Sequence, residues 1–150
     1  MIGMSPVPAG DCEDFLRMAR DYFSELNPTF VPRSDWRERY FSEIVSNPWY
    51  FLRWILCDDA RAGFILFGLE DHHFLPRKTG VIYELYVLPE FRRRGVAKAC
   101  ALEAIRQLRT HSPSKIQLEI LDGASAAVDF WTSLGFRKVS ERFVLDRNSP

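Results

Sequence analysis

Three consecutive arginines followed by small residues form the stretch of this sequence best suited to chemistry. The stretch runs through Arg92, Arg93, Arg94, Gly95, Val96 and Ala97. It follows residues 81–88, which are rich in β-branched and aromatic side chains, and it precedes apolar residues at helical spacing. The first turn of a helix leaves backbone N–H groups unpaired and carries the positive end of the helix dipole, so it attracts phosphate. Small residues expose those amides and arginines add donors, so the sequence predicts a phosphate site here.

Other interpretations of the triple arginine are a solvated helix start and a small nucleic-acid patch. The chain has 20 basic and 20 acidic residues, a balance that provides no general attraction for a polyanion. It also lacks the glycine patterns of a P-loop and of a dinucleotide-binding turn, so nucleotide hydrolysis and dinucleotide binding are both disfavoured. The phosphate must then belong to another kind of ligand.

Residues 92–97 resemble the acyl-CoA pyrophosphate loop of the GNAT N-acetyltransferases, Arg/Gln-x-x-Gly-x-Gly/Ala. Residues 84–92 are similar to that family's fourth strand and the turn after it. Residues 130–136, Phe-Trp-Thr-Ser-Leu-Gly-Phe, resemble its later aromatic-x-x-x-Gly-Phe segment. The two motifs stand in the family's order, in a chain of family length.

The resemblance implies an acyl-CoA-dependent N-acetyltransferase that moves an acetyl group from acetyl-CoA to a primary amine by direct attack. Acetyl-CoA would be the co-substrate, with its pyrophosphate on residues 92–97. Its pantetheine arm would lie along the backbone of Tyr86, Val87 and Leu88. The acceptor would be a small-molecule amine or an amine of a protein.

Glu84 is the only charged residue between positions 81 and 88. The resemblance aligns it with a strand position where family members often carry an acid facing the acceptor. An amine is protonated near neutral pH and must lose a proton before it can attack, so Glu84 is a candidate general base. The alternative is a buried glutamate paired with an arginine. Glu119 is a weaker second candidate for the base.

Trp131 stands where the family usually has a tyrosine that protonates the leaving thiolate. An indole offers only an N–H that is no useful acid, so Trp131 is expected to line the cofactor site. Ala124 likewise stands where an asparagine often contacts the cofactor. Tyr83 or Tyr86 could supply the proton, and strand alternation places them on opposite faces, with Tyr86 on the face of Glu84.

Tyr86 is therefore the preferred acid, although the thiolate could also leave unassisted. The alternative function is an acyl-CoA-binding or partner-binding module of the same fold without turnover. The missing tyrosine at position 131 is its best support.

The elements that must position these residues follow from periodicity and from turn residues. We expect an edge strand at 2–4, a helix at 12–26 capped by Asp11, and a helix from Ser34 to 46. We then expect strands at 50–57, 62–69 and 81–88, a helix from about 97 to 108, a strand at 115–121, a helix at 124–134 ended by Gly135, and a strand at 136–145. This order predicts an α/β (α+β) fold, with a mixed, mostly antiparallel twisted sheet and helices on both faces.

Length and composition add further expectations. A chain of 150 residues fits a single domain over residues 1–150. Its three scattered cysteines suggest reduced thiols in the cytoplasm, and no apolar run approaches the roughly 20 residues that span a bilayer. We expect no metal, because His72 and His73 are neighbours in a loop, and no nucleic-acid or membrane partner. A homodimer is compatible with the sequence.

Overall fold

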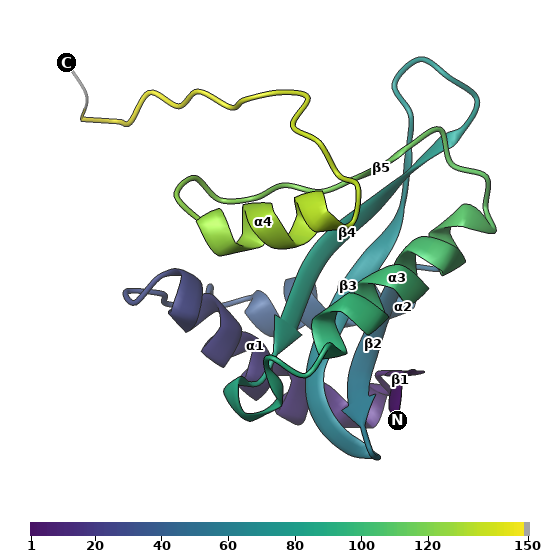
Figure 1. Ribbon diagram of the computed structural model, residues 1–150. Coiled ribbons are helices and arrows are strands. Elements are labelled where there is room, and N and C mark those ends of the chain that lie inside the picture. Colours follow the sequence, from purple (N-terminus) through teal and green to yellow (C-terminus); the bar gives the residue numbers. More distant parts are fainter. Residues whose placement is uncertain (149–150) are drawn as a thin grey trace. The chain divides into compact units, whose positions relative to one another are not determined.

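The computed structural model describes residues 1–148 (Figure 1). It comprises two compact units, Met1–Leu118 and Glu119–Pro150. The expected single domain over residues 1–150 stays a prediction.

The first unit is built on a five-stranded sheet in the order β1-β2-β3-β4-β5. Its strands are β1 (Ile2–Pro6), β2 (Tyr50–Cys57), β3 (Ala60–Asp71), β4 (Lys78–Val87) and β5 (Ile116–Gln117). Neighbouring strands are antiparallel except for β4 and β5, which are parallel. The predicted mixed, mostly antiparallel sheet is confirmed.

Two hairpins are tighter than the sequence indicated. Asp58 and Asp59 both have positive φ angles, of 48° and 66°, and form a two-residue turn, so β3 begins at once after it. At the other end of β3, Asp71 pairs with Lys78. The loop expected over residues 70–80 therefore shrinks to 72–77, because polar residues at the strand ends join the ladder as readily as apolar ones.

Helices cover both faces of this sheet (Figure 1). On one face, α1 (Cys12–Leu26) buries Phe15, Leu16 and Ala19. The Phe15 ring meets the Phe64 ring of β3, with centroids 5.0 Å apart. On the other face lies α3 (Val96–Arg109), whose Leu108 side chain lies 3.4 Å from the point where a Cβ on Gly80 of β4 would stand. Both helices agree with the sequence prediction.

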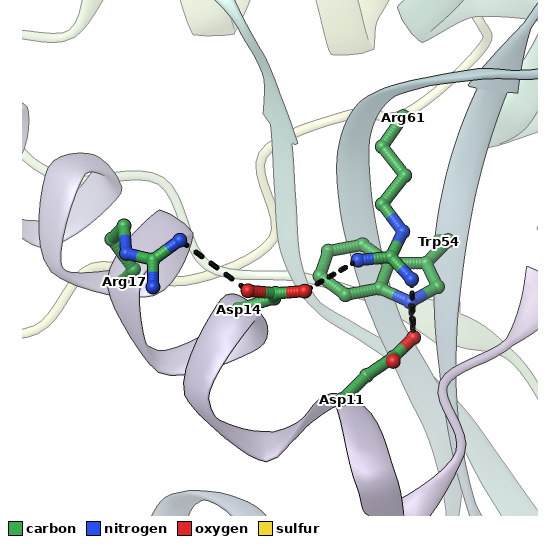
Figure 2. A network of polar contacts seen from close by, with 5 residues as sticks. All are labelled: Asp11, Asp14, Arg17, Trp54 and Arg61. Atoms are coloured by element: carbon green, nitrogen blue, oxygen red, sulfur yellow. Dashed lines mark hydrogen bonds and ion pairs between the residues drawn. The ribbon is translucent and has the colours of Figure 1, made fainter.

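Asp11 directly precedes α1, as expected, and is the last residue of the 3-10 turn η1 (Ala9–Asp11). Its side chain makes no capping bond. Its carboxylate instead accepts hydrogen bonds from Trp54 Nε1 at 2.8 Å and from an Arg61 guanidinium nitrogen at 2.6 Å (Figure 2). The Arg61 guanidinium also lies over the Trp54 ring, 4.5 Å from its centroid. The charged guanidinium of Arg61 is a stronger partner than a helix amide, and together with the Trp54 N–H it fixes the start of α1 against the β2–β3 hairpin.

The second predicted helix is confirmed from Trp36 to Ser46 but is irregular. The segment contains a π-helical turn, η2 (Glu38–Ser42), followed by the short α2 (Glu43–Ser46). Ser34 lies in a turn before it and its side chain makes no capping bond, and the carboxylate of the next residue, Asp35, pairs with Arg33 and Arg39 at 2.8 Å each. The wide turn is marked by the hydrogen bond from the Glu43 N–H to the Glu38 carbonyl.

The parallel strand predicted at 115–121 forms a ladder only at Ile116 and Gln117. In the second unit, α4 (Ser125–Ser133) ends as predicted at Gly135, whose φ is +98°. The Phe136 N–H bonds to the Trp131 carbonyl and the Gly135 N–H to the Thr132 carbonyl, at 3.1 and 3.0 Å, which is a Schellman ending.

The strand predicted at 136–145 is wrong. Up to residue 148 this segment takes no part in any ladder, and its apolar side chains are exposed at Val139, Phe143, Val144 and Leu145. An alternating pattern favours extended backbone, but a strand also needs a hydrogen-bonding partner.

Candidate functional site

The loop between β4 and α3 presents a row of unpaired backbone amides. After the 3-10 turn η3 (Pro89–Phe91), Arg93 and Gly95 both adopt left-handed backbone conformations, with φ angles of 63° and 76°. Within residues 1–148, the N–H groups from Arg93 to Lys98 have no hydrogen-bond partner, and the first helical bond runs from Ala99 to the Gly95 carbonyl. A Cβ on Gly95 would meet no atom within 4 Å. The loop is therefore an open cradle for an anion.

The three arginines of this loop divide into two kinds. Arg92 turns inward: its Nε donates to the Val87 carbonyl at 2.7 Å, and its terminal nitrogen bonds both carboxylate oxygens of Glu25, at 3.0 and 2.9 Å. Arg93 and Arg94 pair with no carboxylate in the part of the chain that the structure describes. Arg92 thus anchors the loop to α1, and the other two are left to meet a ligand.

Within the first unit, the edge of β4 beyond its first residues pairs with no further strand and is free. β5 pairs only with Gly80 and Val81. On the other side, the Leu88 N–H donates to the Ala62 carbonyl of β3 at 2.8 Å. Because the bonds of an antiparallel ladder alternate, the backbone groups of Tyr86 face β3 and those of Leu85 and Val87 face the free edge. Of the residues 86–88 expected to hold the pantetheine arm, Val87 is the one whose amide is free to do so.

Glu84 lies on the face of β4 that α1 covers. It pairs with Leu66 across the ladder, and its carboxylate accepts a hydrogen bond from the Tyr22 hydroxyl of α1. Burial raises the pKa of Glu84, and the bond from Tyr22 opposes this shift. The alternative of an ion pair with an arginine is not what the structure shows, because no cation within residues 1–148 pairs with this carboxylate.

The expectation that Tyr83 and Tyr86 lie on opposite faces is wrong. The register shifts at Leu66 and Phe67 and leaves Tyr83 as an extra residue beside Glu84. Such a bulge breaks the alternation of side chains. Tyr83 packs with Tyr86 against the same core, under α1, and its hydroxyl donates to Glu70 at 2.6 Å.

Tyr86 donates its hydroxyl proton to Glu25, 2.9 Å away. Burial and this hydrogen bond raise the pKa of Tyr86 to about 12, against a smaller opposing effect of Arg92. The phenol therefore keeps its proton at neutral pH and can act as an acid. The hydroxyl proton is engaged in the hydrogen bond to Glu25, so Tyr86 must break that bond before it can donate the proton to a leaving group.

A set of aromatic rings stands beside the Tyr22–Glu84 pair. Trp36 stacks on Tyr40, with centroids 5.3 Å apart and planes within 11°. Phe23 of α1 contacts both rings, with its centroid 6.1 Å from that of Trp36 and 5.2 Å from that of Tyr40. The Tyr40 hydroxyl is the only buried side-chain polar atom without a hydrogen-bond partner in the described residues.

Comparison with known families identifies the chain. The sequence model of the acetyltransferase (GNAT) family matches residues 13–136. The chain belongs to this family. No curated protein matches it.

Solved GNAT structures share its fold. A transcriptional regulator from Bacillus halodurans C-125 superposes with a TM-score of 0.80 at 18% identity, covering 97% of this chain and 99% of that one. A ribosomal-protein-alanine N-acetyltransferase from Brucella melitensis biovar Abortus 2308 has a TM-score of 0.76 at 16% identity, covering 97% and 98%. AAC(6')-Iy, in complex with the bisubstrate analogue CoA-S-monomethyl-acetylneamine, has a TM-score of 0.73 at 18% identity, covering 100% and 99%. At these identities the likeness shows the fold alone.

Two further candidates of this GNAT chain belong to the second unit. Trp131 of α4 is buried, and its ring meets those of Phe130 and Phe136 at centroid distances of 4.8 and 5.4 Å. Glu119 is exposed and paired with the exposed Arg142. Because it is exposed and held by an arginine, Glu119 stays the weaker second candidate for the base.

Sequence reasoning missed Tyr22 and Glu25 as site residues, whereas Tyr40 belongs to the aromatics of the second helix that the family resemblance makes candidate selectivity elements. Tyr22 lies at the helical spacing of the apolar residues in 12–26, and Glu25 belongs to no motif. A signal did exist, since a glutamate inside an apolar strand needs hydrogen-bond donors, and a tyrosine in an apolar helical stripe is a donor that can reach it. The partner itself could not be chosen from spacing alone.

Metal ligands, membrane spans and cavities were the remaining features of interest in residues 1–148. No three His, Cys, Asp or Glu side chains there gather in a way that could hold a metal ion. None of the described helices combines the length and the apolar character needed to cross a membrane. Two surface cavities of about 310 and 630 Å³ are lined by residues other than Glu84, Tyr22 and Tyr40.

Proposed function

We propose that this GNAT chain transfers an acetyl group from acetyl-CoA to a primary amine by direct attack. The observation that supports this most strongly is that β4 carries the half-buried carboxylate of Glu84 and leads directly into the open amides of residues 93–98. An anion-binding loop and a candidate base are thereby fixed on one strand, whose free edge lies between them.

Binding of the co-substrate is assigned to the loop and the strand edge. The amides from Arg93 to Lys98 take the pyrophosphate, with charge from Arg93 and Arg94, and Arg92 holds the loop through Glu25. The backbone of residues 86–88 takes the pantetheine arm, Val87 supplying the free amide. Gly95, Val96 and Ala97 keep the phosphates close to the backbone. Trp131, in the second unit, stays a predicted cofactor-binding residue.

Glu84 accepts a proton from the incoming ammonium, directly or through a water. The neutral amine then forms a C–N bond at the thioester carbon, the C–S bond breaks with its electron pair on sulfur, and the nitrogen loses its extra proton to solvent to give the amide. Tyr86 donates a proton to the departing thiolate, or the thiolate leaves unassisted because a thiol is only weakly basic.

A second candidate, an acyl-CoA-binding module without turnover, is favoured by Trp131 at the usual tyrosine position and by the engagement of Tyr86 with Glu25. Release of free thiol from acetyl-CoA across a panel of amines separates the two functions. Calorimetric binding of acetyl-CoA with no thiol release would support the module, whereas no binding would remove both. A protein amine as acceptor, a cytoplasmic location and a homodimer stay predictions.

A further inference from the structure

The hydroxyl of Tyr40 has no partner in the folded protein. Its oxygen is buried, and no hydrogen-bonding group within residues 1–148 reaches it. The hydroxyls of Tyr22, Tyr83 and Tyr86 each donate to a carboxylate, those of Glu84, Glu70 and Glu25. Tyr40 therefore departs from the pattern that the neighbouring tyrosines follow.

A buried hydroxyl without a partner destabilises the fold, because it gives up its bonds to water and gains nothing in exchange. The ring of Tyr40, unlike its hydroxyl, contributes to packing. It stacks on Trp36, and its centroid lies 5.6 Å from that of Phe15. A phenylalanine would make the same ring contacts without the unpaired oxygen. The hydroxyl is thus not explained by folding.

Tyr40 stands close to the candidate base. Phe23 contacts the rings of both Tyr40 and Tyr22, at centroid distances of 5.2 and 5.0 Å, and Tyr22 holds Glu84. Burial chiefly raises the pKa of Tyr40, and the negative charge of Glu84 adds to the shift. The unpaired hydroxyl and the carboxylate therefore share one neighbourhood.

We propose that Tyr40 is an acceptor-binding residue whose hydroxyl oxygen takes a hydrogen bond from the ammonium of the substrate beside Glu84. This inference rests on the proposed acetyl transfer. An ammonium brings three donors, and Tyr22, which spends its proton on Glu84, keeps oxygen lone pairs that can accept a second bond. The carboxylate and the two phenolic oxygens then share the three donors.

The rings around this group select the rest of the substrate. Trp36, Phe23 and Tyr40 offer apolar faces and no further charged partner, so they suit a primary amine carried on an apolar or aromatic body. A polyamine or an aminoglycoside brings several additional charges or hydroxyls, which these rings cannot satisfy. In this structure the Tyr40 oxygen is closed off, so a neighbouring ring must turn aside when the amine enters.

The test compares Tyr40→Phe with Tyr50→Phe, which removes a hydroxyl from another half-buried tyrosine outside the site. Thiol release from acetyl-CoA is measured with 2-phenylethylamine, spermidine and kanamycin. Thermal stabilisation by each amine in the presence of CoA is measured in parallel. We expect wild type to prefer 2-phenylethylamine, and Tyr40→Phe to raise KM for it roughly ten- to a hundredfold, the usual effect of losing a bond to a charged group.

Tyr40→Phe should also melt at the wild-type temperature or above it, and should bind acetyl-CoA normally. Wild-type KM and amine stabilisation in Tyr40→Phe would overturn the inference, as would a lower melting temperature, which would show that the hydroxyl serves the fold. A wild type that is stabilised by the amine but releases no thiol would refute acetyl transfer and leave Tyr40 as a binding residue. Equal loss in Tyr50→Phe would exclude a specific role for Tyr40.

Discussion

The Tyr22 hydroxyl of α1 donates a hydrogen bond to the Glu84 carboxylate of β4, from 62 positions earlier in the chain. Two opposing effects meet at this carboxylate. Burial raises the pKa of Glu84, and the bond from Tyr22, which favours the ionised form, lowers it. Burial prevails, so the folded protein holds a glutamate that is more basic than usual, with a phenol that limits how basic it becomes.

Replacing Tyr22 by phenylalanine should make Glu84 more basic still. Without the hydrogen bond, burial acts alone and raises the pKa further, so the carboxylate becomes available as a base only at higher pH. The acid limb of the kcat/KM profile should therefore move to higher pH, with the alkaline plateau less affected. Tyr50→Phe serves as the control. A Tyr22→Phe profile that coincides with wild type would show that Glu84 does not govern the acid limb.

Glu84→Gln should lower turnover by roughly 10²–10⁴-fold, the usual range for a general base, and leave acetyl-CoA affinity nearly intact. Glu119→Gln, an exposed glutamate in an ion pair, should keep wild-type turnover. A wild-type rate in Glu84→Gln would exclude Glu84 as the base.

The raised pKa of Glu84 also predicts whether Glu84→Gln is more or less stable than wild type at a given pH. Because the pKa of Glu84 is raised in the folded state, the cost of ionising it appears as the pH rises from the ordinary glutamate pKa to the raised value. Glu84→Gln removes that cost. Above this window the variant should be as stable as wild type or more stable, and the difference should vanish in more acidic solution. Chemical denaturation at several pH values tests this, and a clear loss of stability at neutral pH would instead indicate a structural role.

Some of this site follows from the sequence alone and some does not. The loop at 92–97 and the strand position of Glu84 were predicted because both depend on local pattern. The partners Tyr22 and Glu25 depend on how α1 lies across the sheet, which local pattern does not specify. The bulge that brings Tyr83 to the face of Tyr86 is a matter of register with β3. The strand expected at 136–145 does not form. Its alternation of apolar and polar residues can be read from the segment, but whether another strand lies beside it to accept its hydrogen bonds cannot.

Gly95→Glu should abolish acetyl-CoA binding, because the side chain would fill the open space above the amides and repel the phosphates. Gly10→Glu is the matched control, since a Cβ there also meets no atom within 4 Å and Gly10 lies outside the site. Gly95→Ala should cost about 1–2 kcal/mol of stability, because φ is +76° and a Cβ disfavours that conformation. Calorimetry with folded Gly95→Glu decides the first point, and undiminished affinity would remove the loop from the site.

Tyr86→Phe should slow turnover if the phenol protonates the thiolate. The effect should be largest at high pH, where solvent supplies fewer protons, because the pKa of Tyr86 is raised to about 12 and the wild-type phenol remains protonated there. The change also releases Glu25 from one partner but leaves its two bonds with Arg92 in place, so acetyl-CoA affinity serves as a check on the loop. Equal rates for Tyr86→Phe and wild type across the pH range would leave the thiolate to depart unassisted.

Trp131→Phe should keep most of the turnover, because an indole gives up no proton at useful pH and phenylalanine preserves an apolar ring between Phe130 and Phe136. Trp131→Tyr is the informative partner, since it installs the hydroxyl that the resembled motif usually carries. If departure of the thiolate limits the rate, Trp131→Tyr should exceed both wild type and Trp131→Phe, and should relieve the loss in Tyr86→Phe. If departure is not limiting, all three should turn over alike. A loss of a hundredfold or more in folded Trp131→Phe, the size expected for an acid–base group, would contradict the assignment of Trp131 as an apolar wall.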